Sequence, residues 1–242
     1  MRWPGHATSG PTPWPEDDRS GHRRRGATAS VAGKSMSVAR LTGALVPAVV
    51  ITALCALFCP SSQAQADETR ARKVVLGVCF VCHGSEGESS SELFPRLAGQ
   101  HWEYIAKQLA NFKAGKRKGT AMADMVAELN PDEMVALGRY FEKMSVPSDA
   151  PKDPDLAAVG RYIYHQGNRY SGVPACAACH GPDGLGTSIL PRLAGQYAIY
   201  TETQLKQFNT RERNNDNAVM HAIASKMTPL EMAAVAHYLA GK

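Results

Sequence analysis

Apolar side chains recur at helical spacing along the chain, and no segment shows the alternation typical of a strand. Two segments show the helical spacing clearly, with apolar residues at Trp102, Ile105, Leu109 and Phe112, and then at Met134, Leu137 and Phe141. Apolar residues three or four positions apart gather on one stripe of a helix. The pattern predicts amphipathic helices and an all-α fold.

Two of the expected helices carry clear start sequences. Asn130 and Thr228 are each followed by a proline, and Glu133 and Glu231 lie three residues further on. An Asn or Thr cap, a proline at the first helical position and a glutamate at the third form a capping box. Helices are therefore expected to begin at residues 131 and 229.

Much of the sequence occurs twice. The hexapeptide P-R-L-A-G-Q at 95–100 returns at 191–196, and the segment 130–134 resembles 228–232. Four further residues of the first copy recur 96 positions later, namely Tyr104, Gln108, Leu109 and Phe112, which correspond to Tyr200, Gln204, Leu205 and Phe208. This repeat predicts two copies of one domain. We expect the first at 67–146, and a proline-rich linker with the second at 147–242.

Residues 1–66 precede the repeat and differ from it in composition. Residues 1–35 are rich in Pro, Gly and Arg without an apolar period, whereas Arg40 is followed by a mostly apolar run at 41–58 and by Ala64-Gln65-Ala66. Charged, apolar and small residues in that order are typical of a secretory signal peptide. We expect an extension plus signal peptide at 1–66, cleavage before Asp67, and a periplasmic product. An uncleaved membrane anchor is the alternative.

Charge does not point to nucleic acid. The chain carries a net charge of +5, but residues 1–66 hold seven Lys and Arg against three Asp and Glu. The remaining residues are nearly balanced, so the expected mature protein lacks the basic surface that nucleic-acid binding needs.

The sequence Cys-x-x-Cys-His occurs once in each copy. The residues are Cys79, Cys82 and His83, and then Cys176, Cys179 and His180. One helical turn brings both thiols to the same side, where they can form thioethers with haem vinyl groups while the histidine binds the iron. Two such motifs in register predict two covalently bound haem c groups.

Zinc and redox chemistry are the alternatives to haem for this motif. A zinc site requires four ligands, and each copy supplies three. A redox dithiol explains neither the repeated histidine nor the duplication. Haem accounts for all the repeated residues.

A methionine is the usual sixth iron ligand in electron-transfer haem proteins, because its thioether raises the reduction potential. Met122 aligns with Met220, whereas Met125 aligns with Ile223 and Met227 with Leu129. Met134 and Met232 also align, but they lie in an apolar helical stripe typical of core residues. Met144 is a further candidate, and the repeat favours Met122 and Met220.

The other histidines of the mature chain have no histidine counterpart in the opposite copy; they are His101, His165, His221 and His237. We interpret them as surface or hydrogen-bonded histidines. The proximal histidines need an acceptor for their second ring nitrogen. Pro95 and Pro191, 12 and 11 residues further on, are candidates to offer a backbone carbonyl.

Taken together, the two Cys-x-x-Cys-His motifs, the P-R-L-A-G-Q-x-x-x-Y-x-x-x-Q-L stretches, Met220 before A-I-A-S-K and the final helices resemble the cytochrome c4 family. The resemblance covers about residues 68–242. It implies two tandem class I cytochrome c domains with haem bound covalently through the four cysteines. It further implies His83 and His180 as proximal ligands, Met122 and Met220 as distal ligands, and electron donation to respiratory terminal oxidases.

Two positions depart from the family pattern. Gly160 lies in the opening helix of the second copy at the spacing the family uses, but the first copy has Val74, which puts the close packing of that helix in doubt. Thr203 stands opposite Lys107, so any contact of that lysine is absent from the second copy.

The sequence thus predicts a one-electron carrier with redox proteins as partners. One rival is a dihaem electron-transfer subunit of a dehydrogenase, such as flavocytochrome c sulfide dehydrogenase. The other is a dihaem peroxidase, which would need an open iron position, whereas both copies offer a methionine. Because the haem completes each small core, the protein without haem is expected to be largely unfolded.

Overall fold

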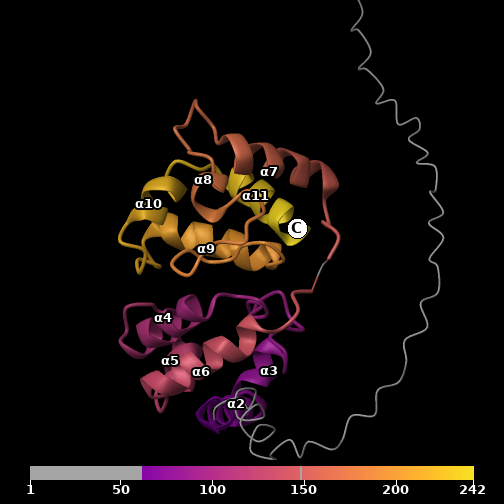
Figure 1. Ribbon diagram of the computed structural model, residues 1–242. Helices are drawn as coiled ribbons and strands as arrows, with labels where there is room; N and C mark the ends of the chain where they lie inside the picture. The colour runs from indigo at the N-terminus through magenta and orange to yellow at the C-terminus, as the bar shows by residue number, and fades with distance from the viewer. Residues whose placement is uncertain (1–61, 148) are drawn as a thin grey trace, which may run out of the picture. The chain divides into compact units, whose positions relative to one another are not determined.

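The computed structural model describes residues 62–147 and 149–242 (Figure 1). Helices make up the regular structure of these residues, and the β-structure recorded for them is one antiparallel bridge between Asn168 and Val173. The predicted all-α fold is confirmed. In chain order the elements are α2 (Ser62–Val74), the π-helical η1 (Val75–Cys79), α3 (Phe80–His83), α4 (Trp102–Lys113), α5 (Thr120–Val126), α6 (Pro131–Glu142), α7 (Pro154–Gln166), α8 (Ala177–His180), α9 (Ala198–Thr210), α10 (Val219–Ala224) and α11 (Pro229–Ala240).

The first half builds its core where α6 packs against α2 and α4. The predicted capping box starts α6: Glu133 N donates to Asn130 Oδ1 at 2.9 Å, and Asn130 N donates to Glu133 Oε2 at 2.9 Å. The apolar stripe of α6 points into the core, with Leu137 and Phe141 each 2% exposed. Periodicity and cap therefore define this helix as the sequence predicted.

The second half repeats this arrangement with α11 packed against α7 and α9. Its capping box is also present, with Glu231 N donating to Thr228 Oγ1 at 3.2 Å and Thr228 N donating to Glu231 Oε2 at 2.7 Å. Figure 1 shows α7 and α11 against each other in the second half. Each half thus has a long opening helix, a central helix and a closing helix around one apolar core.

The opening helices cross the closing helices closely, and here the expectation about Val74 was wrong. A Cβ on Gly160 would lie 1.9 Å from the Ala234 carbonyl oxygen, so only glycine fits at this crossing. In the first half, Ala71 and Val75 are buried at 2% and 0% exposure, with the spacing of Gly160 and Tyr164. The small residue corresponding to Gly160 is therefore Ala71, and α2 does pack on α6.

The two halves differ in how the opening helix reaches the cysteine motif. Ala71 lies eight residues before Cys79, whereas Gly160 lies sixteen residues before Cys176. In the first half α2 continues through the π-helical turn η1 directly into α3. In the second half residues 167–176 form a loop closed by the Asn168–Val173 bridge. Because of this difference in length, counting residues back from the cysteines pairs the wrong positions of the two opening helices.

Most of the expected leader, including the apolar run 41–58, lies outside the described residues. Its last five residues, 62–66, form the start of α2. Within 62–147 and 149–242, no helix has the length and apolar character needed to cross a membrane.

Candidate haem-binding sites

Each Cys-x-x-Cys-His motif ends in one turn of helix. The α3 turn closes with Gly84 N donating to Phe80 O, and the α8 turn with Gly181 N donating to Ala177 O, both at 3.0 Å. The four cysteines of the described chain, Cys79, Cys82, Cys176 and Cys179, form no disulfide. The local backbone therefore presents two free thiols and a histidine in the same way in both halves.

The histidine of each motif is buried and held by a proline carbonyl. His83 Nδ1 lies 2.9 Å from Pro95 O, and His180 Nδ1 lies 3.2 Å from Pro191 O. The prediction that these two prolines supply the acceptor is confirmed. Because Nδ1 is engaged with an acceptor, Nε2 is the nitrogen that can bind a metal.

Electrostatics around the motif favour neutral side chains. Burial lowers the pKa of His83 and of His180, more than their hydrogen bonds to the proline carbonyls raise it. Neutral imidazole is the form that coordinates a metal. Burial raises the pKa of the Cys79 thiol and raises that of Cys176 to about 11. A redox dithiol needs a lowered thiol pKa, and the Cys79 and Cys176 thiols lack that activation.

A zinc site at either motif would need a further protein ligand beside the cysteines and the histidine. Among the residues that are described, no group of three or more His, Cys, Asp or Glu side chains is placed to hold a metal ion. Within 62–147 and 149–242, the Cys and His donors of each motif therefore lack the additional protein ligand that a structural zinc site requires.

The two methionines favoured by the repeat lie at equivalent places. Met122 is on α5 and Met220 on α10, and each is half-buried against the core of its own half. Three other methionines are core residues, as predicted, with exposures of 5%, 6% and 2% at Met134, Met227 and Met232. Met122 and Met220 thus share a setting that differs from that of the core methionines.

Three of the remaining histidines have protein partners, as predicted from the sequence. His101 Nε2 lies 2.8 Å from Leu185 O, and His221 Nδ1 lies 2.9 Å from Phe208 O. His165 Nε2 lies 2.9 Å from the Tyr238 hydroxyl. Each of these three histidines therefore has a hydrogen-bond partner within the protein.

Contacts between the halves come from the repeated P-R-L-A-G-Q segments. Gln100 donates from Nε2 to Arg192 O and accepts from Arg192 N at Oε1, and Gln196 makes the same two bonds with Arg96, at 2.9 to 3.0 Å. Tyr197 adds a hydrogen bond from its hydroxyl to Ser89 O at 2.6 Å. The repeated glutamines therefore join the two halves reciprocally.

A second polar contact between the halves has two arginines at its centre, of which Arg213 is buried and Arg117 is half-buried. Arg117 donates to Tyr200 and Gln204 of the other half, and Arg213 donates to Tyr104 at 2.8 Å. The full set, here called the arginine cluster, comprises Tyr104, Gln108, Arg117, Tyr200, Gln204, Arg213 and Asn215.

The arginine cluster carries positive charge, and Asp216 interacts electrostatically with Arg213 without forming a direct ion pair with it. Arg213 is 6% exposed, and no ion pair joins Arg117 or Arg213 to an Asp or Glu in 62–147 or 149–242. Burial opposes ionisation of Tyr200, but Arg117 and Arg213 outweigh it and lower the pKa of Tyr200. Buried cations are normally paired. Haem brings two carboxylates, so this cluster fits a haem protein.

Comparison with known proteins decides the family. Residues 157–241 match the family model for cytochrome c, and residues 66–141 match the model for subunit III of cbb3-type cytochrome c oxidase. Cytochrome c4 from Thiocapsa roseopersicina is 42% identical over 181 residues, covering 73% of this chain and 91% of that protein. The chain belongs to the cytochrome c4 family.

Solved and curated relatives agree with this membership. The reduced recombinant cytochrome c4 from Pseudomonas stutzeri superposes with a TM-score of 0.68 at 33% identity, covering 74% of this chain and 97% of that one. The thiosulfate dehydrogenase electron acceptor of Thiomonas intermedia is 36% identical, covering 68% of this chain and 78% of that protein. Cytochrome c4 proteins carry two covalently attached haem c groups and transfer electrons, and so does this chain.

Several residues of the arginine cluster were not assigned a role from the sequence. Tyr104, Gln108 and their counterparts were recognised as repeated, but the pairing across the halves was not expected. Arg117 and Arg213 also lie 96 positions apart, the same offset as the tyrosines. That common offset is the pattern by which the arginine cluster could have been found.

Proposed function

We propose that this cytochrome c4 is a periplasmic electron carrier that delivers electrons to a respiratory terminal oxidase. The observation that supports the electron-carrier part of the proposal is the histidine geometry, with Nδ1 of His83 and of His180 fixed by Pro95 O and Pro191 O. Such a bond orients the ring and sets its tautomer, so Nε2 is prepared for iron in both halves. Each haem, when bound, supplies an iron that gains or loses one electron.

We assign the ligands by half, with the first domain at 67–146 and the linker and second domain at 147–242. In the first domain Cys79 and Cys82 attach the haem, while His83 and Met122 bind its iron. In the second domain Cys176, Cys179, His180 and Met220 have the same roles. The matching settings of Met122 on α5 and Met220 on α10 support this assignment, as does their alignment in the repeat.

The arginine cluster would hold the acid groups of the haems. Arg117 and Arg213 are cations between the halves, and haem carboxylates are the anions that a haem protein can offer them. A charge-assisted pair with a buried guanidinium is among the stronger polar contacts in a protein. The cluster would thereby help to orient both haems.

The export proposal rests on the leader sequence together with the motif. Covalent haem attachment and an Arg, apolar run and Ala-x-Ala order both point to a compartment outside the cytoplasm. Cleavage before Asp67 would remove residues 62–66, the first five residues of α2.

Intact mass of the protein under denaturing conditions tests the attachment sites and the cleavage together. The full chain is expressed in a host that exports and matures c-type cytochromes. Two haem masses on a chain starting at Asp67 are expected. One haem or none would show that a motif has another role. Oxidase-coupled oxygen consumption, with the reduced protein as sole donor, then tests the partner.

A dehydrogenase-linked role is the second candidate, and a relative favours it. The Thiomonas intermedia protein is named as the electron acceptor of thiosulfate dehydrogenase. If this chain has such a role, a thiosulfate dehydrogenase should reduce it in stopped-flow mixing and should co-purify with it. Fast reduction by that enzyme with slow oxidation by the oxidase would favour the second candidate over the first.

A further inference from the structure

The backbone just after each proximal histidine is held by a tyrosine, buried in the second half and half-buried in the first, and the two tyrosines come from different helices. In the second half Tyr164 of α7 donates from its hydroxyl to Gly181 O at 2.6 Å. In the first half Tyr140 of α6 donates to Ser85 O at 2.9 Å. Each acceptor lies one or two residues after the proximal histidine. We call each of these bonds a tyrosine tether.

The first half uses a tyrosine from another helix because it has no tyrosine at the position of Tyr164. Val75 stands where the second half has Tyr164, and both side chains are 0% exposed. A valine fills this core position but cannot donate a hydrogen bond. The first half therefore takes its tether from the closing helix.

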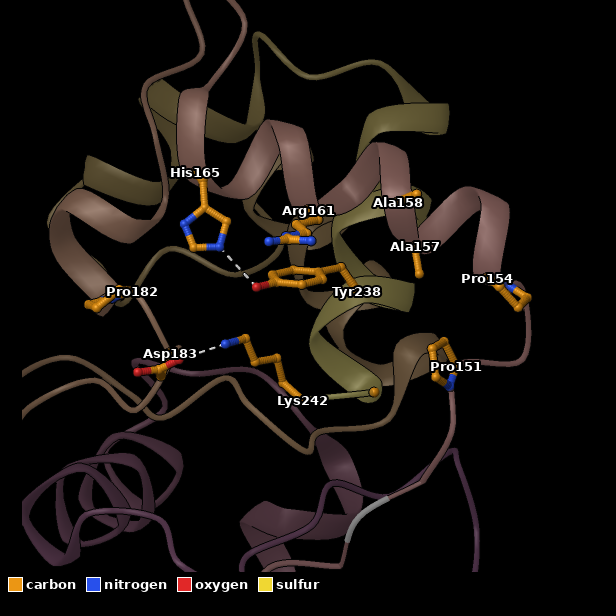
Figure 2. A pocket seen from close by; sticks show the side chains of 11 residues that line it. Pro151, Pro154, Ala157, Ala158, Arg161, His165, Pro182, Asp183, Tyr238 and Lys242 are labelled. Atoms are coloured by element: carbon orange, nitrogen blue, oxygen red, sulfur yellow. Dashed lines mark hydrogen bonds and ion pairs between the residues drawn. The ribbon is translucent and has the colours of Figure 1, made fainter. Parts of the chain in front are cut away.

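The repeat alone would assign the tether of the second half to Tyr238, the counterpart of Tyr140. Instead the Tyr238 hydroxyl lies 2.9 Å from His165 Nε2 and points to a pocket of about 610 Å³ (Figure 2). The pocket is lined in part by Arg161, Asp183 and Lys242. Tyr238 is therefore directed away from the bond that Tyr140 makes.

The tethered loops include the peptides of the proximal histidines. Gly186 N donates to His180 O at 2.9 Å, and Ser89 N donates to His83 O at 2.8 Å. In the second half the carbonyls of His180 and Gly181 both have donors, the second from Tyr164. Burial raises the pKa of Tyr164, so its hydroxyl stays protonated and donates. Buried carbonyls with fixed donors hold the backbone in one position.

We propose that Tyr164 and Tyr140 are positioning residues for the proximal histidines, acting on the second and first haem respectively, and that Tyr238 has no such role. The inference rests on the proposed ligands His83 and His180. Each tether fixes the loop behind its histidine, and the loop fixes the ring that binds iron. Residues around an axial ligand tune the iron in this way.

Phenylalanine substitutions test this because they remove a hydroxyl and keep the ring. The midpoint potentials of the holo-protein variants Tyr164→Phe, Tyr140→Phe and Tyr238→Phe are measured by spectroelectrochemical titration. The variants Met122→His and Met220→His identify which potential belongs to the first haem and which to the second. We expect Tyr164→Phe to shift the second midpoint potential alone and Tyr140→Phe to shift the first alone. Amide exchange at Gly186 should also become faster in Tyr164→Phe. Tyr238→Phe, the matched control, should leave both potentials unchanged.

The possible outcomes distinguish a failure of the tether proposal from a failure of the proposed haem ligands. A shift of the second potential in Tyr238→Phe but not in Tyr164→Phe would overturn the proposal, and so would two unchanged potentials in all three variants. Denatured mass must show two haems in each variant, and a missing haem would instead contradict the attachment sites. If Tyr164→Phe yields no holo-protein, Tyr140→Phe carries the same test on the first half.

Discussion

Gln196 pairs with the backbone of Arg96 by two hydrogen bonds: Arg96 N donates to Gln196 Oε1, and Gln196 Nε2 donates to Arg96 O, both at 3.0 Å. Gln100 makes the equivalent pair with Arg192. A side-chain amide that satisfies both backbone groups of a residue is a specific contact, because losing it leaves two partly buried polar groups unpaired. The repeated glutamines therefore couple the two halves.

The double variant Gln100→Ala/Gln196→Ala should uncouple the unfolding of the halves. Each lost hydrogen bond destabilises by about 0.5–1.5 kcal/mol, so the contact between the halves weakens while each core stays intact. We expect one urea transition to become two, monitored by haem absorbance and circular dichroism. Gln166→Ala, at the exposed end of α7, is the control. A single transition at an unchanged midpoint would contradict the coupling.

The crossing of α7 over α11 predicts a large effect of one methyl group. In Gly160→Ala the Cβ would meet the Ala234 carbonyl oxygen, and backbone cannot move aside as a side chain can. Overpacking of this kind destabilises by about 1–3 kcal/mol. Gly77→Ala is the matched control, because nothing lies within 4 Å of its Cβ position. Equal unfolding midpoints for the two variants would show that the crossing adapts.

Local sequence patterns predicted α4, α6 and α11 because their stripes and caps depend on residues close in the chain. The spacing from His83 to Pro95 likewise led to the correct hydrogen bond, since a short loop brings those groups together. Val74 was wrongly aligned with Gly160 at the helix crossing. The second half has eight more residues than the first between the crossing position and its first cysteine, whereas the first half continues directly through η1. The arginine cluster joins residues about a hundred positions apart, so the shared offset of 96 marks Arg117 and Arg213 as a repeated pair but does not give their contacts with the other half.

The proposed axial ligands Met122 and Met220 predict a selective change in midpoint potential. Met122→His or Met220→His should lower one midpoint potential, within the ~0.8 V range that axial ligands control, because imidazole favours ferric iron more than a thioether does. The methionine-to-iron charge-transfer band should fall by half in each variant. Met134→Leu replaces a buried core methionine and should keep both the band and the potentials. A full band in Met220→His would disprove that ligand.

The arginine cluster predicts a charge effect shared by both haems. Arg213→Gln removes a buried cation between the halves, and reduction adds an electron to each haem, so both midpoint potentials should fall if the haem carboxylates pair there. Arg213→Lys retains the charge and should recover part of the loss, while Arg211→Gln changes an exposed side chain and should have little effect. Spectroelectrochemical titration at two salt concentrations checks the result. A buried cation is weakly screened, so the fall should persist at high salt, and a fall that salt abolishes would locate the effect at the surface.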